Sequence, residues 1–440
     1  MMTEFEVQGI PVSKLALDYG TPLFVYDGDV LVEQYEGLRR RLHPKLEMFF
    51  SLKANPNVSI CALLQSMGAR AEVSSAAELV TAIRAGVLPE DIVFVGPGKS
   101  ADELAACLDE DILAIVCESP GELELIDQLA RLRGKVARVA LRINPAFAVK
   151  GSGLTMGGKP RQFGIDEAQL NELGNAARRF PGVRLMGVHV YMGTRILAED
   201  VVIENTRRVL DLARRVSTLL DFSLELVDVG GGLGVAYFDG ERDIDPSVLA
   251  AGLEPIIAEF AAASPRTRLA MELGRYLTAR AGTYVVRVRY VKTSLGQHFA
   301  ITDGGTHHHM AAVGIGSFVK RNFPMRLLDG ADAPTESWTV TGPLCTPNDT
   351  LAKGVALPPL RPGDLLGVLR SGAYGPTASP VLFLGHGAPA EVLVHCGRPY
   401  LIRDRDRTED LLRPQYLHDF SALRVPDRRT DSPQLKELKR

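Results

Sequence analysis

A lysine that follows an apolar run is the residue whose chemistry is easiest to predict. Residues 47–52 have the pattern of a buried strand, and Lys53 comes directly after them. Burial of an ammonium group is costly unless the amine has a partner or a reaction to perform. A Schiff base with an aldehyde is one such reaction. We therefore expect Lys53 to hold a carbonyl compound at the end of this strand.

Polar side chains also follow other short apolar runs. They are Glu72, Arg142, Asn144, His189, Thr194, Asp228, Glu272, Arg275 and Tyr276, with glycines at 193, 230–232, 234 and 274. Each of them alone could be a turn or capping residue. The glycine run at 230–234 does not have the spacing of a P-loop or a dinucleotide fingerprint. It could form only a tight turn, or it could let backbone N–H groups approach an anion, with Arg275 as a second ligand.

Alternating strands and helices must position these residues. Strands are expected at 47–52, 70–73, 92–95, 113–116, 136–143, 184–190, 224–229 and 269–272, and helices at 59–67, 76–85, 101–108, 121–133, 166–178, 200–219 and 246–262. Eight strands over about 230 residues favour a (β/α)8 TIM barrel, whose active site lies at the C-terminal ends of the strands. An open doubly wound sheet is the alternative, because periodicity cannot show closure.

The pattern changes after residue 275. Short β-type runs at 283–292, 297–302, 336–341, 365–369, 381–384 and 390–394 predict a separate antiparallel β domain. We expect residues 1–30 to pack with this β domain, residues 31–280 to form the barrel, residues 281–402 to form the β domain and residues 403–440 to form a polar tail.

The composition argues against several classes of partner. The formal net charge of −3, without a long basic run, gives no support for nucleic acid or an anionic membrane. No secretory signal or apolar run of transmembrane length is expected. Five widely spaced cysteines predict free thiols in a reducing compartment, and hence a cytoplasmic protein.

Taken together, the motifs resemble those of the fold-type III pyridoxal-phosphate (PLP) decarboxylases, which include diaminopimelate and ornithine decarboxylases and, more distantly, alanine racemase. The similarity extends from about residue 20 to residue 395. It is carried by residues 51–55 (Ser-Leu-Lys-Ala-Asn), 187–190 (Gly-Val-His-Val), 193–194 (Gly-Thr), 230–234 (Gly-Gly-Gly-Leu-Gly), 272–276 (Glu-Leu-Gly-Arg-Tyr), 342–345 (Gly-Pro-Leu-Cys) with Asp349, and 372–374 (Gly-Ala-Tyr). The resemblance implies a TIM barrel followed by an antiparallel β-barrel domain, as in alanine racemase.

The resemblance also implies residue roles around pyridoxal 5'-phosphate. Lys53 is similar to the lysine that holds the cofactor as an internal aldimine and later moves protons. Glu272 is similar to the carboxylate that faces the pyridine nitrogen, and His189 to the histidine that stacks on the ring. Glu72 occupies the place of an acid near the cofactor. The remaining cofactor-binding set, chiefly for the phosphate, is Thr194, Gly231, Gly232, Gly274, Arg275 and Tyr374.

Two further residues imply a homodimer with shared active sites. Cys345 resembles the cysteine that enters the partner's site as a proton donor, and Asp349 matches the acid that follows it and contacts the substrate. The implied reaction is decarboxylation of an L-amino acid through an external aldimine and a quinonoid. Glu272 favours this reaction over racemisation, because an ionised carboxylate keeps the ring nitrogen protonated.

The chain departs from diaminopimelate decarboxylases after Cys345. Thr346 and Pro347 replace the Glu-Ser of their motif, so a glutamate that would hold a distal ammonium group is absent. With the insertion at 150–164, this resembles the branch of antibiotic, siderophore and exopolysaccharide pathways, whose members act on modified amino acids that are N-acylated or bound to a carrier protein. The insertion could be a flexible connection, or a loop that closes on the substrate and uses Arg161 or Lys159 to hold an anionic group.

Three alternatives remain open. A meso-diaminopimelate decarboxylase is disfavoured by Thr346, and a racemase by Glu272. A catalytically silent homologue that regulates a partner is disfavoured by the presence of both Lys53 and Cys345. The run of three histidines at 307–309 is not expected to bind a metal, because adjacent residues of a strand point to alternate faces.

Overall fold

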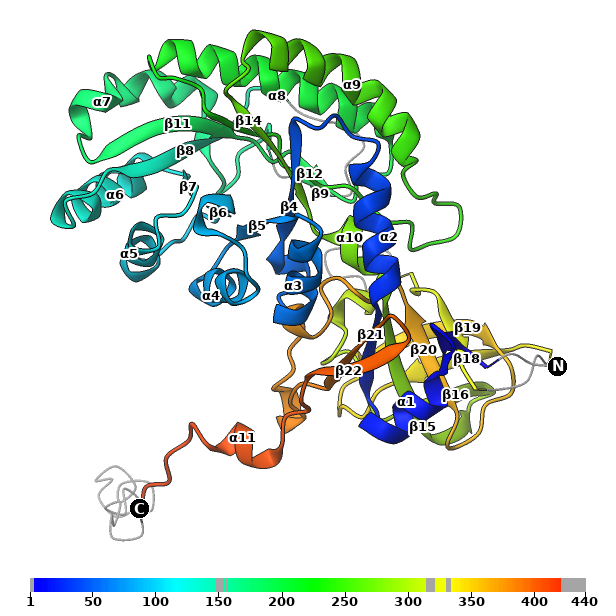
Figure 1. Cartoon of the computed structure of the whole chain (residues 1–440). Coiled ribbons are helices and arrows are strands. Elements are labelled where there is room, and N and C mark those ends of the chain that lie inside the picture. Colours follow the sequence, from blue (N-terminus) through cyan, green and yellow to red (C-terminus); the bar gives the residue numbers. More distant parts are fainter. Residues whose placement is uncertain (1–3, 148–153, 156, 314–320, 330–333, 421–440) are drawn as a thin grey trace, which may run out of the picture.

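The computed structural model describes residues 4–147, 154–155, 157–313, 321–329 and 334–420 (Figure 1). Part of the glycine-rich insertion, at 148–153 and 156, and the end of the predicted polar tail, at 421–440, lie outside the described residues.

Eight parallel strands form a closed barrel. Their order is β8-β11-β13-β14-β4-β5-β6-β7, and β7 also pairs with β8, which closes the ring. The strands are β4 (Leu46–Ser51), β5 (Arg70–Val73), β6 (Ile92–Phe94), β7 (Ala114–Cys117), β8 (Ala137–Asn144), β11 (Val183–His189), β13 (Leu226–Asp228) and β14 (Arg268–Leu273). The predicted TIM barrel is therefore confirmed, and the open sheet is excluded.

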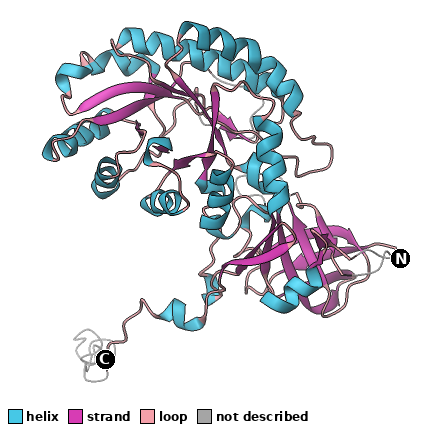
Figure 2. Cartoon of the chain, in the orientation of Figure 1, coloured by secondary structure: helices cyan, strands magenta, loops and turns pink. Residues whose placement is uncertain are grey.

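Helices cover the outside of the barrel (Figure 2). They are α2 (Gly28–Arg39), α3 (Val58–Ser66), α4 (Ala76–Arg84), α5 (Ala101–Asp109), α6 (Pro120–Leu132), α7 (Ala176–Arg179), α8 (Glu199–Leu219) and α9 (Pro246–Ala263). The continuous helix expected at 166–178 is wrong. A 3-10 segment, Glu167–Leu173, ends at Gly174, whose φ of 60° breaks the helix before α7 begins.

Helix α9 corrects the expectation that the chain has no apolar run of transmembrane length. Within the described part of the chain, it is the one helix that is long and apolar enough to cross a membrane. Its side chains Leu249, Leu253 and Ile257 are buried, and it packs beside α8. Its apolar face is therefore that of an outer barrel helix.

Strand register directs the polar residues of the sequence into the barrel. His189 of β11 lies opposite Asp228 of β13 and Arg142 of β8. Phe49 of β4 lies opposite Glu272, and Ser51, two residues further on, lies opposite Glu72. Paired strand residues share a face of the sheet. These side chains therefore face the interior, above an apolar plug that is formed by Phe49, Val93, Val95, Leu113, Ala114, Val116, Ala140, Met186, Leu226 and Ala270.

A second, mixed β-sheet lies at one end of the barrel (Figure 1). It contains β3 (Leu23–Asp27), β15 (Gly282–Ser294), β16 (Gln297–Thr302), β17 (Met325–Leu327), β18 (Glu336–Thr341), β19 (Thr350–Leu357), β20 (Leu365–Leu369), β21 (Ala390–His395) and β22 (Arg398–Arg403). The predicted β domain is confirmed, but it is not purely antiparallel, because β16 pairs with β18 and β3 with β21 in parallel. The strand expected at 381–384 is wrong, since Phe383–Gly385 form an exposed 3-10 turn.

The two ends of the chain reach different places. Near the N-terminus, β1 (Glu6–Val7), β2 (Ile10–Pro11) and α1 (Val12–Tyr19) precede β3, which lies between β15 and β21. Near the C-terminus, the segment that contains α11 (Thr408–Leu412) extends away from both parts (Figure 1). A cis peptide bond joins Thr21 to Pro22 just before β3.

Candidate active site

A cavity of about 570 Å³ lies at the C-terminal ends of the barrel strands. Its lining includes Lys53, Tyr191, His189, Thr194, Glu272, Arg275, Tyr374, Arg142, Phe163 and residues 96–99. Six of the predicted cofactor-binding residues are therefore brought to one cavity, although they come from segments far apart in the sequence. Glu72, Gly231, Gly232 and Gly274 lie beside these residues, as described below.

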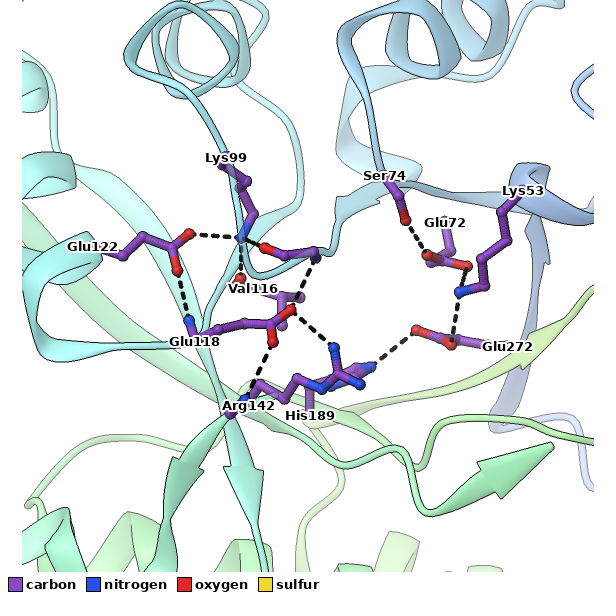
Figure 3. A network of polar contacts seen from close by, with 12 residues as sticks. Lys53, Glu72, Ser74, Lys99, Val116, Glu118, Glu122, Arg142, His189 and Glu272 are labelled. Carbon is purple, nitrogen blue, oxygen red and sulfur yellow. Dashed lines mark hydrogen bonds and ion pairs between the residues drawn. The ribbon is translucent and has the colours of Figure 1, made fainter. Parts of the chain in front are cut away.

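Lys53 lies between two buried carboxylates (Figure 3). Its Nζ is 2.8 Å from Glu72 Oε2 and 3.8 Å from Glu272 Oε2. Ser74 Oγ donates a hydrogen bond of 3.0 Å to Glu72 Oε1, which fixes the orientation of that carboxylate. Burial alone lowers the pKa of Lys53, but the charges of Glu72 and Glu272 together raise it well above its usual value.

Glu272 provides a negative charge at the floor of the cavity. His189 Nε2 lies 3.0 Å from Glu272 Oε1, and both side chains are buried. Burial by itself raises the pKa of Glu272, but Lys53 and the His189 hydrogen bond outweigh it and lower the pKa below its usual value. Because an ionised carboxylate only accepts hydrogen bonds, His189 Nε2 must be the donor.

The part of the cavity beside Arg275 and Tyr374 is suited to an anion. Arg275 begins the short helix α10 (Arg275–Thr278), and its Nη1 donates to Tyr237 Oη at 3.0 Å. The Arg275 guanidinium lies 4.7 Å from the centre of the Tyr374 ring. Its Nε is buried and has no hydrogen-bond partner among the residues that the structure describes. An anion in the cavity would satisfy this donor.

The glycine run packs where no side chain fits. A Cβ on Gly231 would lie 1.8 Å from the Glu272 carbonyl oxygen, and one on Gly232 would lie 2.0 Å from the Gly193 carbonyl oxygen. Gly232 also has a φ of +96°, which L side chains rarely adopt. Gly274 similarly allows close contact with Ala54, since its Cβ would lie 2.8 Å from Ala54 Cβ. The run thus brings backbone close to Thr194 and Glu272, at the edge of the cavity.

Tyr191 is a cavity residue that the sequence reasoning missed. Its ring centre is 5.6 Å from Lys53 Nζ, and burial raises its pKa to about 12, so the phenol stays neutral. The sequence contained a signal for this position. Tyr191 follows His189 by two residues, and in an extended chain two such side chains point to the same face. His189 is completely buried against Glu272, whereas Tyr191 is partly exposed to the cavity. Tyr191 thus offers a second aromatic ring for stacking.

The predicted proton donor and the two predicted substrate-binding residues do not line this cavity either. Cys345 is exposed on the loop before β19. Asp349 is buried, and its carboxylate accepts hydrogen bonds from the Thr306 and Leu344 backbone N–H groups at 2.8 and 2.7 Å. It therefore anchors the Cys345 loop within its own chain. Arg161 is exposed. Their predicted contacts with the substrate remain predictions.

The three adjacent histidines are not in a strand, contrary to the reasoning from sequence. They form a buried turn after β16. His308 lies 3.1 Å from Tyr284 Oη and 2.8 Å from the Gly387 carbonyl oxygen, and His309 lies 2.8 Å from Ser371 Oγ. These two rings therefore tie together loops of the β domain.

An amine between two carboxylates, with an unsatisfied arginine in the same cavity, matches an aldehyde cofactor that carries a phosphate. At the mouth of a TIM barrel followed by a β domain, this arrangement defines a fold-type III PLP enzyme. Residues 29–279 match the family described as pyridoxal-dependent decarboxylase, pyridoxal binding domain.

Relatives that match nearly the whole length of the chain support the same family assignment. The chain is 40% identical over 419 residues to an L-glutamyl-[BtrI acyl-carrier protein] decarboxylase of Niallia circulans, covering 94% of this chain and 98% of that protein. The structure of Helicobacter pylori diaminopimelate decarboxylase with L-lysine superposes with a TM-score of 0.83 at 28% identity, covering 92% and 98% of the two chains. An SrLDC mutant in complex with PLP gives a TM-score of 0.75 at 26% identity, covering 89% and 96%. The chain belongs to the pyridoxal-dependent decarboxylases and is a PLP-dependent amino-acid carboxy-lyase.

Proposed function

We propose that this enzyme decarboxylates an L-glutamyl unit, or a similar aminoacyl unit, that is attached to an acyl-carrier protein. The observation that carries the proposal is the 40% identity, over nearly the full length of both chains, to a protein named for that activity. Thr346 and Pro347 stand where diaminopimelate decarboxylases have Glu-Ser, which also favours a substrate other than diaminopimelate.

The acidic residues that line the cavity, and the partners they already have, favour a substrate that lacks a distal ammonium group. Of the described residues that line the cavity, only Glu103 and Glu272 are acidic. Glu272 contacts His189 and Lys53, and Glu103 accepts hydrogen bonds from the backbone N–H groups of Ser100 and Ala76. Diaminopimelate would leave its second ammonium without a carboxylate, whereas an acyl chain that ends in a thioester has no such group.

Each side chain then has a task around the bound cofactor. When bound, pyridoxal phosphate supplies the electron sink that accepts the electron pair left by loss of carbon dioxide. Lys53 holds the cofactor and later carries a proton on Nζ. Glu272 would supply the negative charge for the ring nitrogen, and His189 or Tyr191 would contact the ring. Glu72 orients Lys53. Thr194, Gly231, Gly232, Gly274, Arg275 and Tyr374 bind the phosphate end.

We further propose a cytoplasmic homodimer with shared sites. Cys345 is exposed outside the cavity of its own chain, a position that suits entry into the site of a second copy, where its thiol would protonate the α-carbon. Asp349 holds the loop for this purpose. Arg161 at the insertion would contact an anionic part of the substrate or its carrier.

The substrate is tested by measuring carbon dioxide release from L-glutamyl-carrier thioester, free L-glutamate and meso-diaminopimelate. We expect turnover of the thioester, little turnover of the free amino acids, and none with Lys53→Ala. Efficient turnover of free diaminopimelate with an inert thioester would refute the proposed substrate.

The shared site is tested by subunit mixing. Lys53→Ala and Cys345→Ala homodimers are each expected to have little activity. After random reassociation, half of the dimers are hybrids with one intact site, so about a quarter of the wild-type activity should return. Failure of a stable mixed dimer to regain activity would contradict the sharing of sites.

A further inference from the structure

Tyr237 is a buried side chain that contacts the arginine of the cavity but is not itself one of the described residues that line the cavity. Its Oη accepts a hydrogen bond of 3.0 Å from Arg275 Nη1. The Arg275 Nε is buried and has no partner among the described residues. Because the guanidinium group is planar, a hydrogen bond that holds Nη1 also fixes the direction of the edge that carries Nε. Tyr237 therefore controls how Arg275 presents its free donor to an anion.

The β domain contacts Tyr237 through an aromatic side chain. The Tyr237 ring stacks on the ring of Phe323, with the ring centres 4.3 Å apart and an angle of 19° between the two planes. Phe323 is buried and lies just before β17 of the second sheet. A stacked aromatic pair adds stability beyond the burial of its area. One side chain of the β domain therefore fixes the ring whose hydroxyl group holds Arg275.

The barrel loop that carries Tyr237 is attached to the same β domain by an ion pair. Arg370, which follows β20, lies 3.1 Å from Asp243 Oδ1. The same Asp243 oxygen accepts a hydrogen bond of 2.6 Å from the Ala236 backbone N–H, and Glu241 accepts one of 3.0 Å from the Tyr237 backbone N–H. The backbone on which Tyr237 is placed is therefore held by its own carboxylates, and one of these carboxylates is held by the β domain.

We propose that Tyr237 is a positioning residue that couples the β domain to the phosphate end of the cofactor site. Phe323 sets the position of the Tyr237 ring, the Tyr237 hydroxyl group sets the plane of the Arg275 guanidinium, and Arg275 binds the phosphate. This role rests on the proposed binding of the phosphate by Arg275. It adds that Arg275 binds the phosphate tightly only while Phe323 is stacked on Tyr237, so that the β domain determines the affinity for the cofactor.

Pyridoxal separates this role from simple packing, because it lacks the phosphate but keeps the aldehyde that reacts with Lys53. The dissociation constants of pyridoxal phosphate and of pyridoxal are measured on the apoenzyme by equilibrium dialysis. The variants are Tyr237→Phe, which removes only the hydroxyl group, Phe323→Leu, which removes the stacked ring, and Arg275→Gln, which removes the charge. The ³¹P chemical shift of the bound phosphate is compared between the wild type and Tyr237→Phe.

We expect Tyr237→Phe and Phe323→Leu each to raise the dissociation constant of pyridoxal phosphate about five- to tenfold and to leave that of pyridoxal within about twofold of the wild-type value. Arg275→Gln should raise the constant for pyridoxal phosphate about 100-fold. The ³¹P signal should shift in Tyr237→Phe. If Phe323→Leu does not fold, Arg370→Gln replaces it, because it releases the same loop from the β domain.

The two proposals fail in different ways. Wild-type affinity of Arg275→Gln for pyridoxal phosphate would refute the phosphate-binding role of Arg275 itself. A large loss in Arg275→Gln with unchanged affinity and ³¹P shift in Tyr237→Phe would overturn the positioning role alone. Equal weakening of pyridoxal and pyridoxal phosphate by Tyr237→Phe would also overturn it, because the phosphate would not be involved. Wild-type affinity of Phe323→Leu would overturn the coupling to the β domain.

Discussion

Replacement of Glu72 by glutamine should speed the covalent loading of the apoenzyme with pyridoxal phosphate while it slows turnover. Only the neutral amine of Lys53 attacks an aldehyde. The pKa of Lys53 is raised well above its usual value by Glu72 and Glu272, so the neutral form is rare near pH 7. Removal of the nearer carboxylate must lower this pKa and enlarge the reactive fraction.

The geometry sets the size of the effect. An opposite charge within about 4–6 Å shifts a pKa by about 1–3 units. Glu72 lies at 2.8 Å, but Glu272 remains at 3.8 Å, and the Lys53 side chain is 34% exposed to solvent, which screens the interaction. We therefore take the lower part of the range and expect the loading rate to rise about ten- to a hundredfold. Turnover falls because the ammonium of Lys53 loses the carboxylate that orients it for proton transfer.

Absorbance of the bound cofactor measures the loading rate of the apoenzyme in stopped flow between pH 6.5 and 9. The matched control is Ser74→Ala, which removes the hydrogen bond to Glu72 but keeps its charge. We expect this control to load within about threefold of the wild-type rate. An unchanged loading rate in Glu72→Gln, with both variants folded, would refute the assignment of the raised pKa to Glu72.

Three further outcomes follow from the same geometry. Glu272→Gln should bind the cofactor yet lower kcat about 100-fold in a carbon dioxide release assay, because the charge opposite the ring nitrogen is lost; a loss of under threefold would contradict this role. Tyr191→Ala should increase the dissociation constant of the cofactor about three- to tenfold in equilibrium dialysis, while Tyr191→Phe should not, if the ring stacks; equal affinity of the two variants would place the stacking elsewhere. Burial lowers the pKa values of His308 and His309 to about 3. Between pH 6.5 and pH 3, only the unfolded chain therefore binds these protons, and the Tm should decrease as the pH is lowered through this range. The fall should be smaller in His309→Gln, whose amide can still reach Ser371, and an unaltered slope would show that His309 is not the titrating group.

The barrel could be predicted from sequence because its signals are local. All eight strands were placed within three residues of their ends, since a buried strand flanked by a helix has a pattern that neighbouring residues determine. The β domain was predicted less well. Strand β3 lies between β15 and β21, more than 250 residues away in sequence, and no local pattern specifies such a pairing. The exposed turn at Phe383–Gly385 has the apolar composition of a strand, but Gly385 has a φ of 70° and ends any extended run.

The site also contains some features that local sequence predicts and others that arise only in the folded chain. Lys53, Glu272 and Arg275 could be found because each lies within two residues of the end of a strand, in a recognisable motif. The unsatisfied atoms of His189 and Asp228 could not be found, because the need for a partner arises only when two strands pair in register. Asp349 could be found from its motif, but its contacts could not be predicted. A motif places an acid near the cysteine, but hydrogen bonds from Thr306 and Leu344 determine what its carboxylate contacts.

Two parts of the cavity are built differently. Glu72, His189 and Glu272 are residues of barrel strands, and the strand register fixes their positions. Near Arg142, Glu118 receives hydrogen bonds from the Arg142 guanidinium, from the Gly96 N–H and from the Gly164 N–H, so one buried carboxylate ties two loops to the barrel. Phe163 in the second loop packs on the Arg142 guanidinium, 4.6 Å from its ring centre, and lines the cavity. Changes in these loops can therefore alter the cavity wall without moving Lys53 or Glu272. This explains how relatives that are named for different substrates can share one barrel.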